Sequence, residues 1–449
     1  MQKIYIRNNG PVKEFEMDIQ NFNLLIGEQA TGKSTIAKSV YFFRIIKTSI
    51  IDYLTQVCDT KTYKNEFQDE VRFDKAIRRD LKDIFIKLFG YSWDLNPEFE
   101  MWYEYATDIS IRVALHDGDR PNKKLISVNY SKVLYDKIEA LRKEIIEIYY
   151  NDTRSMLSLA LTSERRKRNH EMIIQRVNEI FADNKETYFI PAGRSLLTVM
   201  SSNRAMMNSA TNLDLITEQF MMLIDSIRNG FERGVKMAHQ YYPVEQRSFD
   251  VNDIAEFIIH MQKGEYFSKK GKEYLQIPED SEHMVAINFA SSGQQEILWV
   301  LNFLYVLLLK QEKAFVIIEE PEAHIYPALQ KELMEFIAMY TNLQDNSVFI
   351  TTHSPYVLTA VNNLYYAGVL AQEGHGKAVH QVVPKRKMIS AGQLSAYKLL
   401  SRQEKGKELN YLPLFEDSGR EIRTAMLDEV SAQINEVYTA LYNIELDGE

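Results

Sequence analysis

A loop between residues 21 and 35 is the stretch of this sequence that points most clearly to chemistry. A short apolar run ends at Gly27, the spacing Gly-x-x-x-x-Gly-Lys-Ser follows, and an apolar segment with helical spacing begins at Ile36. A nucleoside triphosphate is held by inward-pointing backbone N–H groups, a helix N-terminus, a mobile ammonium and a hydroxyl that ligates magnesium. The spacing therefore predicts a strand, a phosphate-binding loop and a helix.

The glycines, the lysine and the serine of this loop each have an expected role. Gly27 and Gly32 permit the turn. Lys33 is expected to reach the outer phosphates as a catalytic residue, and Ser34 to ligate Mg²⁺. The predicted nucleotide-binding residues of the loop are Gly27, Glu28, Gln29, Ala30, Thr31, Gly32, Lys33, Ser34 and Thr35.

Two further apolar runs end in ionisable side chains. The run from residue 314 ends in Glu319 and Glu320, and the run from residue 347 ends in His353. Phosphoryl transfer needs one carboxylate for the magnesium shell and one to polarise the attacking water, so Glu319 is assigned to the metal and Glu320 to the water. His353 is a candidate contact for the terminal phosphate. A solvated strand end and a structural histidine are the alternatives.

Small polar residues stand at the start of a long apolar helix expected over residues 297–309. They are Ser291, Ser292, Gly293 and Gln294. Free N–H groups and the helix dipole at such a start make an anion site. An ordinary N-cap that binds nothing explains the same residues.

The elements that must position these side chains follow from the apolar periodicity. Because open parallel sheets gather ligands at the carboxyl ends of their strands, the loop, the carboxylates and His353 are expected at one sheet edge. Expected strands cover 3–6, 14–19, 22–26, 99–106, 109–116, 124–130 and 284–287, with a hairpin at 269–272; expected helices lie within 36–54, 73–89, 131–184, 195–240 and 250–262.

Two segments allow two interpretations each. The basic run Arg165 to Arg168 is either a solvated helix face or a contact for DNA phosphates or a partner. A C-terminal helix over 421–442 carries an apolar stripe that either packs on its own domain or docks an effector. The stripe consists of Ile422, Met426, Val430, Ile434 and Tyr438.

Composition limits the classes of protein. The chain has 449 residues and a net charge of −9, so any contact with nucleic acid needs a local basic patch. The single cysteine, Cys58, excludes an internal disulfide and a cysteine-rich zinc site, which favours a reducing, cytoplasmic location. The run over 297–309 is too short to cross a bilayer, and no membrane contact is expected.

Four motifs in this order make the chain resemble the ABC-type ATPases of the SMC, RecF and OLD group. Gly27 to Thr35 matches the Walker A loop, Ala290 to Gln294 the signature motif, and Val316 to Glu320 the Walker B strand. Residues 321–327 match the D-loop, and His353 the switch histidine. The resemblance implies an α/β fold of the ABC type with mixed and antiparallel sheets around a P-loop core, a helical insertion and no long coiled coil.

The resemblance also implies ATP and Mg²⁺ as ligands, and a nucleotide held between two chains. The signature residues Ser291 to Gln294 would then act in trans, in a homodimer or a higher even-numbered homo-oligomer. Ala30 stands where many relatives have glycine, Ser292 replaces the first signature glycine, and Glu319 stands where aspartate is commoner. No glutamine loop is recognised between 40 and 187, and Arg194 is the candidate for that role.

Domain boundaries follow from the motifs. Residues 1–130 are expected to form the first half of the ATPase domain, 131–187 a charged helical insertion, 188–372 the second half, and 373–449 a C-terminal helical tail. Isolated Asp417, Asp428 and Asp447 do not form the clustered ligands that a Toprim nuclease needs. Nuclease activity in this chain is therefore not expected.

Within this group, the chain most resembles stand-alone ATPases of bacterial antiphage defence systems of the Septu or PARIS type. The resemblance rests on its short length and on the sequence Glu-Glu-Pro-Glu-Ala-His. That resemblance implies an ATPase that acts as a sensor or scaffold for a separately encoded effector, a nuclease or toxin. A DNA repair clamp similar to RecF, which grips duplex DNA, is the alternative.

Overall fold

The computed structural model describes residues 1–59, 73–90, 96–117, 124–154, 159–201, 213–277, 283–401, 410–415 and 419–423. Within these residues the fold is α/β, as predicted, with one mainly parallel sheet and two antiparallel sheets. Several predictions concern residues outside the described part. These residues are the members of the C-terminal apolar stripe after Ile422, the side chain of Arg165, and Asp417, Asp428 and Asp447.

The central sheet has the strand order β14-β13-β3-β12-β11-β7, and only β14 runs antiparallel to its neighbour. All residues of β3, β11 and β12 are buried, which explains why these strands are continuous apolar runs rather than alternating ones. The strands are β3 (Phe22–Gly27), β7 (Glu186–Ile190), β11 (Ala314–Glu319), β12 (Ser347–Thr352), β13 (Leu394–Leu399) and β14 (Tyr411–Pro413).

The expected helical tail over 373–449 is wrong for residues 394–399. These residues form β13, which pairs in parallel with β3, so the central sheet continues past residue 372. Gly27 makes this pairing fit, because a Cβ at that position would lie 2.8 Å from the carbonyl oxygen of Leu399. The sequence did not reveal which strand pairs with this edge of β3, because the partner of Phe22 is Leu394, in a distant part of the chain. The boundaries at 130, 187 and 188 remain predictions.

A second sheet carries the N-terminal strands in the order β2-β1-β4-β5-β6, with every neighbouring pair antiparallel. The predicted meander over 99–130 is confirmed as β4 to β6. The strands are β1 (Gln2–Asn9), β2 (Val12–Ile19), β4 (Glu100–Ala106), β5 (Ile109–Asp117) and β6 (Lys124–Tyr130).

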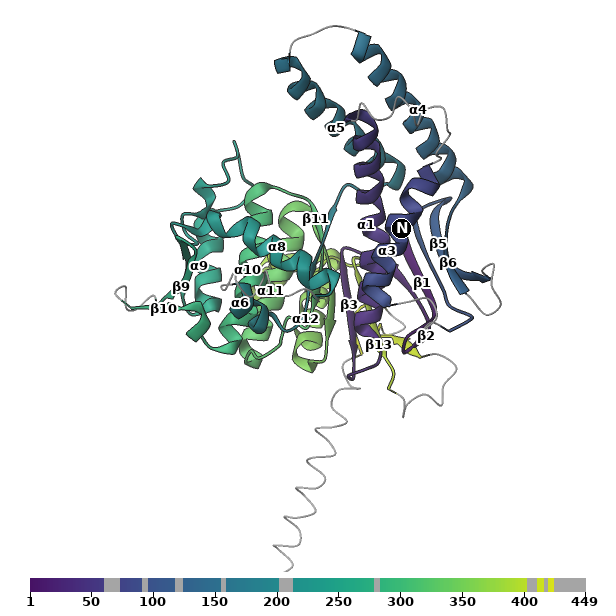
Figure 1. Ribbon diagram of the computed structural model, residues 1–449. Coiled ribbons are helices and arrows are strands. Elements are labelled where there is room, and N and C mark those ends of the chain that lie inside the picture. The colour runs from purple at the N-terminus through teal and green to yellow at the C-terminus, as the bar shows by residue number, and fades with distance from the viewer. Residues whose placement is uncertain are drawn as a thin grey trace, which may run out of the picture.

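Helix α1 (Lys33–Asp59) lies between the two sheets and joins their cores (Figure 1). Its buried Arg44 is held by Asp183 at 2.7 Å and stacks on the ring of Phe315, with 3.9 Å from the guanidinium carbon to the ring centre. Lys47 donates to the carbonyl of Asp183 at 3.0 Å. The phosphate-loop helix is thereby attached to the segment that leads into β7. Helix α3 (Phe73–Phe89) packs against α1.

The helical insertion consists of α4 (Lys132–Arg154) and α5 (Leu159–Phe181), which extend together away from the sheets in Figure 1. Each helix has 23 residues, so the insertion is a short hairpin and the expected absence of a long coiled coil holds for the described residues.

Most of the remaining helices cover the other face of the central sheet, and a small hairpin sheet lies at the outer edge of this group beside α9, as Figure 1 shows. The predicted hairpin at 269–272 is confirmed as β8 and β9, with β10 beside β9. The α-helices are α6 (Arg194–Ser201), α8 (Leu215–Arg228), α9 (Val251–Gln262), α10 (Ser292–Lys310), α11 (Pro327–Gln344), α12 (Pro355–Leu370) and α13 (Gly376–Val382). The strands are β8 (Glu265–Lys269), β9 (Lys272–Gln276) and β10 (Met284–Ala286). Short helices cover Asn229–Phe231, Ala238–Gln240, Ile287–Phe289, Ala371–His375 and Lys385–Lys387.

The apolar run over 297–309 lies inside α10 and is buried along its whole length. Among the described residues, no helix combines the length and the apolar character that crossing a membrane requires.

Candidate active site

The phosphate loop connects β3 to α1 and contains two residues with left-handed backbone. Ala30 has a φ of 60° and Gly32 a φ of 109°. A Cβ at Gly32 would lie 2.5 Å from Cγ2 of Val12, so only glycine fits there. The Thr31 hydroxyl donates to the carbonyl of Glu28 at 2.8 Å and closes the loop. These contacts show why the loop needs glycine at position 32 and tolerates Ala30 only with strain.

Lys33 is the first residue of α1, and its ammonium is buried at the carboxyl end of β3. It donates to the carbonyl oxygens of Gly27 and Glu28, both at 2.8 Å, and lies 3.3 Å from Nδ1 of His353. Burial lowers the pKa of Lys33 to about 8, although three nearby glutamates oppose that shift. The cation is thus already positioned at the loop where phosphates are expected.

Glu319 and Ser34 meet next to this lysine. Glu319 is 7% exposed, and the nearby Ser34 hydroxyl favours the ionised form of its carboxyl group. Burial raises the pKa of Glu319, and the Ser34 hydroxyl offsets part of that shift. Oε1 of Glu319 is buried without a hydrogen-bond partner, so it is free to ligate a cation. A hydroxyl and a carboxylate oxygen form a hard donor set that suits Mg²⁺, which also takes phosphate and water ligands.

Glu320 follows β11 with a left-handed backbone, at a φ of 44°. Its N–H donates to the carbonyl of Thr351 at 2.9 Å, and its Oε1 lies 3.0 Å from Nε2 of His353. Since the ammonium of Lys33 donates to Nδ1, the ring proton is on Nε2 and is donated to Glu320. One imidazole therefore connects the ammonium with the carboxylate.

Glu322 is a site residue that the motif assignment left without a role. Its Oε1 accepts hydrogen bonds from the hydroxyl of Thr352 at 2.6 Å and from the N–H of His353 at 2.8 Å. It therefore fixes the backbone that presents the imidazole. The second glutamate of the Glu-Pro-Glu sequence, two residues after Glu320, is the sequence signal that could have suggested it.

The predicted signature residues lie at the start of α10 and form a capping box. The Ser291 hydroxyl accepts from the N–H of Gln294 at 3.3 Å, and Oε1 of Gln294 accepts from the N–H of Ser291 at 3.1 Å. A Cβ at Gly293 would lie 2.7 Å from the carbonyl of His324, so the loop after β11 packs directly on this helix start. Ser291 and Ser292 are exposed. Within the described residues, no hydrogen bond joins this motif to the phosphate loop of the same chain.

Arg194 does not lie where a glutamine-loop residue would contact nucleotide. Its side chain is 0% exposed, and its guanidinium is used by backbone carbonyls and by Glu296. The expectation for Arg194 is therefore wrong, because a fully enclosed guanidinium with these partners cannot reach a ligand.

A cavity of about 600 Å³ adjoins the phosphate loop on the side of the N-terminal sheet. Ser34, Thr35 and Lys38 form one wall, the turn between β1 and β2 forms another, and the end of α3 closes it. This volume and its mixed polar and apolar lining are typical of a small-molecule pocket.

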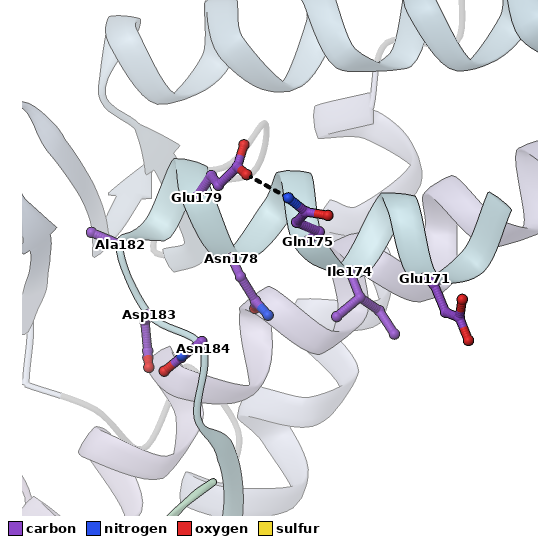
Figure 2. A pocket seen from close by; sticks show the side chains of 8 residues that line it. All are labelled: Glu171, Ile174, Gln175, Asn178, Glu179, Ala182, Asp183 and Asn184. Atoms are coloured by element: carbon purple, nitrogen blue, oxygen red, sulfur yellow. Dashed lines mark hydrogen bonds between the residues drawn. The ribbon is translucent and has the colours of Figure 1, made fainter. Parts of the chain in front are cut away.

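A second cavity, of similar size, lies along α5 and does not contain any predicted site residue. Figure 2 shows its lining side chains on one helix face and on the loop that follows, with Gln175 donating to Glu179 at 3.0 Å. The lining consists of Glu171, Ile174, Gln175, Asn178, Glu179, Ala182, Asp183 and Asn184. It is separate from the phosphate loop.

Comparison with known proteins decides the family. The family model described as "AAA ATPase domain" matches residues 1–358. This chain belongs to that family. No curated protein matches this AAA ATPase.

Solved structures similar to this AAA ATPase include three SMC head domains. One is an SmcHead bound to the C-terminal winged-helix domain of ScpA, with 11% identity and a TM-score of 0.36. The second is the SMC head domain from Thermotoga maritima, with 11% identity and a TM-score of 0.34. The third is an Smc head domain with an extended coiled coil, bound to the C-terminal domain of ScpA and derived from Pyrococcus furiosus, with 12% identity and a TM-score of 0.35. Each of the three comparisons covers 80% of this chain. The share of the other chain that is covered is 90% for the first two structures and 92% for the third.

The structure of this AAA ATPase brings Lys33, Ser34, Glu319, Glu320 and His353 together from three neighbouring strands. The strand β12 lies between β3 and β11, so His353 is placed between the phosphate loop and the carboxylates. Ser291 to Gln294 are on a separate helix start and do not join this group within one chain.

Proposed function

We propose that this AAA ATPase binds ATP with Mg²⁺, hydrolyses it to ADP and phosphate, and closes into a dimer with ATP between the subunits. The observation that carries the proposal is the continuous chain of contacts from Lys33 through His353 to Glu320, with Ser34 and Glu319 beside it. An ammonium for the phosphates, a carboxylate for water and an oxygen pair for a cation are the parts that phosphoryl transfer requires.

In the proposed reaction, Lys33 binds the outer phosphates while Glu320 orients water for in-line attack. The water oxygen forms a bond to the terminal phosphorus, its proton passes to the Glu320 carboxylate, and the bond to ADP breaks with its electron pair on ADP. His353 keeps Glu320 in place through Nε2. Ser34 and Glu319 would hold Mg²⁺, which supplies positive charge to the phosphate oxygens when bound.

The nucleoside part of ATP is proposed to occupy the cavity beside Ser34 and Thr35. This cavity is continuous with the start of α1, where the phosphates would be bound. Its apolar walls include Leu88 and Phe89 at the end of α3, and its polar walls include Asn8 and Asn96. These groups can accommodate a base and a ribose together.

The proposed dimer uses the exposed surface around the start of α10. Phe289 is 85% exposed and lies two residues before Ser291 in the chain, and Tyr326 is 79% exposed and lies two residues after His324, whose carbonyl packs on Gly293. Exposed aromatic residues next to an anion-binding helix start favour a surface that is covered by a second subunit. Ser291 to Gln294 would then contact the nucleotide of that subunit, in a dimer or a higher even-numbered oligomer.

Light scattering with and without ATP and Mg²⁺ tests this assembly. We expect the parental protein to dimerise with ATP, and Ser291→Arg to bind nucleotide but remain monomeric. Ser248→Arg is the matched control, because Ser248 is also an exposed serine but lies beside the amino ends of the strands. A dimer that forms equally well in Ser291→Arg, or equally well without ATP, would contradict the proposal.

The biological role we propose is that of a sensor or scaffold that controls a separately encoded effector in antiphage defence. The support is the sequence resemblance to stand-alone defence ATPases together with a compact fold lacking long arms in its described part. Co-purification of the proteins encoded next to this gene, with ATP or ADP present, tests the role. Failure of any neighbouring nuclease or toxin to bind in either nucleotide state would count against it.

A duplex-DNA clamp is the second candidate, and the basic face of α5 favours it. Arg166, Lys167 and Arg168 are exposed there, and the Lys167 side chain is 79% exposed. If DNA is bound at this face, affinity should fall steeply with salt concentration and rise with ATP. Replacing Lys167 and Arg168 with glutamate should abolish that binding without affecting ATP hydrolysis.

A further inference from the structure

Arg194 and Glu296 form an ion pair that is completely enclosed in the protein. Both side chains are 0% exposed, and Nε of Arg194 lies 3.2 Å from Oε2 of Glu296. Two buried charges are costly to desolvate, and an apolar pair of the same volume would often be at least as stable. The pair therefore requires a role other than filling the core.

Glu296 connects the signature helix to the start of α6. It lies in the first turns of α10, two residues after Gln294. Its carboxylate accepts hydrogen bonds from the N–H of Arg194 at 3.1 Å and from the N–H of Ser195 at 3.0 Å. The carboxylate thus caps α6, so that a movement of the α10 start also moves Arg194.

Arg194 connects the same helix start to the end of β11. Its guanidinium donates to the carbonyl of Glu319 at 2.6 Å and to the carbonyl of Glu320 at 2.8 Å. It also donates to the carbonyl of Glu296 at 3.0 Å and of Pro191 at 2.8 Å. One planar group therefore holds together the carboxyl ends of β7 and β11 and the first turns of α10.

The backbone of Glu320 depends on this contact. A residue with a side chain adopts a φ of 44° only where its surroundings hold it. On one side its N–H donates to Thr351, and on the other its carbonyl accepts from Arg194. The orientation that brings the Glu320 carboxylate to His353 is consequently set in part by Arg194.

We propose that Arg194 and Glu296 are positioning residues that couple the signature motif to Glu320 within each chain. The inference rests on the proposed dimer, in which Ser291 to Gln294 contact the nucleotide of the other subunit while Glu320 acts on its own. Contact at the signature shifts the α10 start, and the ion pair passes that shift to Glu320. Hydrolysis at the two nucleotides then becomes interdependent.

The test compares Arg194→Lys and Glu296→Gln with a matched pair of variants elsewhere. Arg228 and Glu273 also form a buried ion pair, with Nη2 2.9 Å from Oε2, but this pair joins the end of α8 to β9 of the small hairpin sheet. Arg228→Lys and Glu273→Gln therefore report the general effect of weakening a buried Arg–Glu pair. For all four variants and the parental protein, the measurements are thermal stability, affinity for a fluorescent ATP analogue, ATP-dependent dimerisation, and the rate and Hill coefficient of hydrolysis.

We expect the parental enzyme to hydrolyse ATP with a Hill coefficient above 1. Arg194→Lys and Glu296→Gln should bind nucleotide within about twofold of the parental affinity and still dimerise, but hydrolyse at least about tenfold more slowly with a Hill coefficient near 1. The control variants should lose similar thermal stability and keep both the rate and the Hill coefficient. Parental rates in the Arg194 and Glu296 variants, or a parental Hill coefficient of 1, would overturn the coupling. A parental protein that does not bind ATP or dimerise would instead refute the proposed function.

Hydrogen exchange on the parental protein tests the same link without a substitution. ATP-driven dimerisation should slow exchange of the N–H groups at Arg194 and Ser195, which donate to the Glu296 carboxylate. Unchanged exchange there, with slowed exchange at Ser291 to Gln294, would overturn the coupling even if the variants fail to fold.

Discussion

Oε1 of Glu320 lies 3.0 Å from Nε2 of His353, although the two residues follow different strands of the central sheet. The same imidazole accepts from the ammonium of Lys33 at Nδ1, 3.3 Å away. The carboxylate that would polarise water and the cation that would bind phosphate are thus held by one ring. This relationship gives each of the three residues a separate and measurable consequence.

Glu320→Gln should retain nucleotide affinity and lower the hydrolysis rate by about 100-fold or more, because an amide cannot accept the proton of water. The amide oxygen can still accept from Nε2 of His353, so the geometry is preserved. The variant should therefore accumulate as an ATP-bound dimer in light scattering. Hydrolysis at the parental rate would refute the assignment of Glu320.

His353→Ala should lower the hydrolysis rate by about tenfold, since Glu320 and Lys33 both lose a hydrogen-bond partner. Nucleotide affinity should change less than the rate, because Lys33 keeps its two carbonyl partners. His380→Ala, at an exposed position on α13, is the control and should behave like the parental protein. Equal rates in both variants would assign His353 a purely structural role.

Nucleotide affinity should fall as the pH rises through about 8, the pKa to which burial lowers Lys33. A lowered pKa means that the ammonium loses its proton earlier than an exposed lysine would. One pH unit above that value only about a tenth of the ammonium remains, so affinity should be about tenfold weaker. Calorimetry in two buffers should also detect proton uptake on binding in this range. Constant affinity up to strongly alkaline pH would contradict this account, and Lys33→Ala should abolish binding.

The Mg²⁺ concentration needed for half-maximal hydrolysis should rise as the pH falls. Burial raises the pKa of Glu319, so its carboxyl keeps its proton at pH values where an exposed glutamate is ionised, and the cation must displace that proton. Glu319→Gln should remove the pH dependence and raise the Mg²⁺ concentration needed for half-maximal hydrolysis by about tenfold or more. A titration whose midpoint is independent of pH would exclude Glu319 as a ligand.

Ala30→Gly should stabilise the protein by about 0.5–1 kcal/mol. Ala30 has a left-handed φ, and the Cβ makes this backbone conformation unfavourable. Glycine removes that strain, and the gain exceeds the stability lost because glycine gives the unfolded chain more conformational entropy. Ala182→Gly is the matched control, since Ala182 also has a positive φ, 48°, but lies at the end of α5. Both should unfold at a higher denaturant concentration, and only Ala30→Gly should alter nucleotide affinity. A loss of stability in Ala30→Gly would show that the loop strain is relieved elsewhere.

The sequence alone predicted the elements that depend on local signals. The spacing of Gly27, Gly32 and Lys33 implies the loop because the turn and the helix start are formed by adjacent residues. The apolar runs before Glu319 and His353 indicate buried strands because each run is continuous and ends in polar side chains. Helices and strands over residues 1–130 were predicted for the same reason, as their periodicity is a local property.

Only the tertiary structure decided which of these elements are neighbours. The position of β12 between β3 and β11 places His353 against both Lys33 and Glu320, and β13 occupies an edge of β3 that was assigned to no strand. Arg194 was expected near nucleotide and instead joins Glu296 to Glu320. Strand pairing uses backbone N–H and C=O groups that almost every residue carries, so side-chain types do not specify the partner strand. A buried arginine donates to whichever carbonyl groups the fold brings close to it. Neither is encoded in the spacing of residues along the chain.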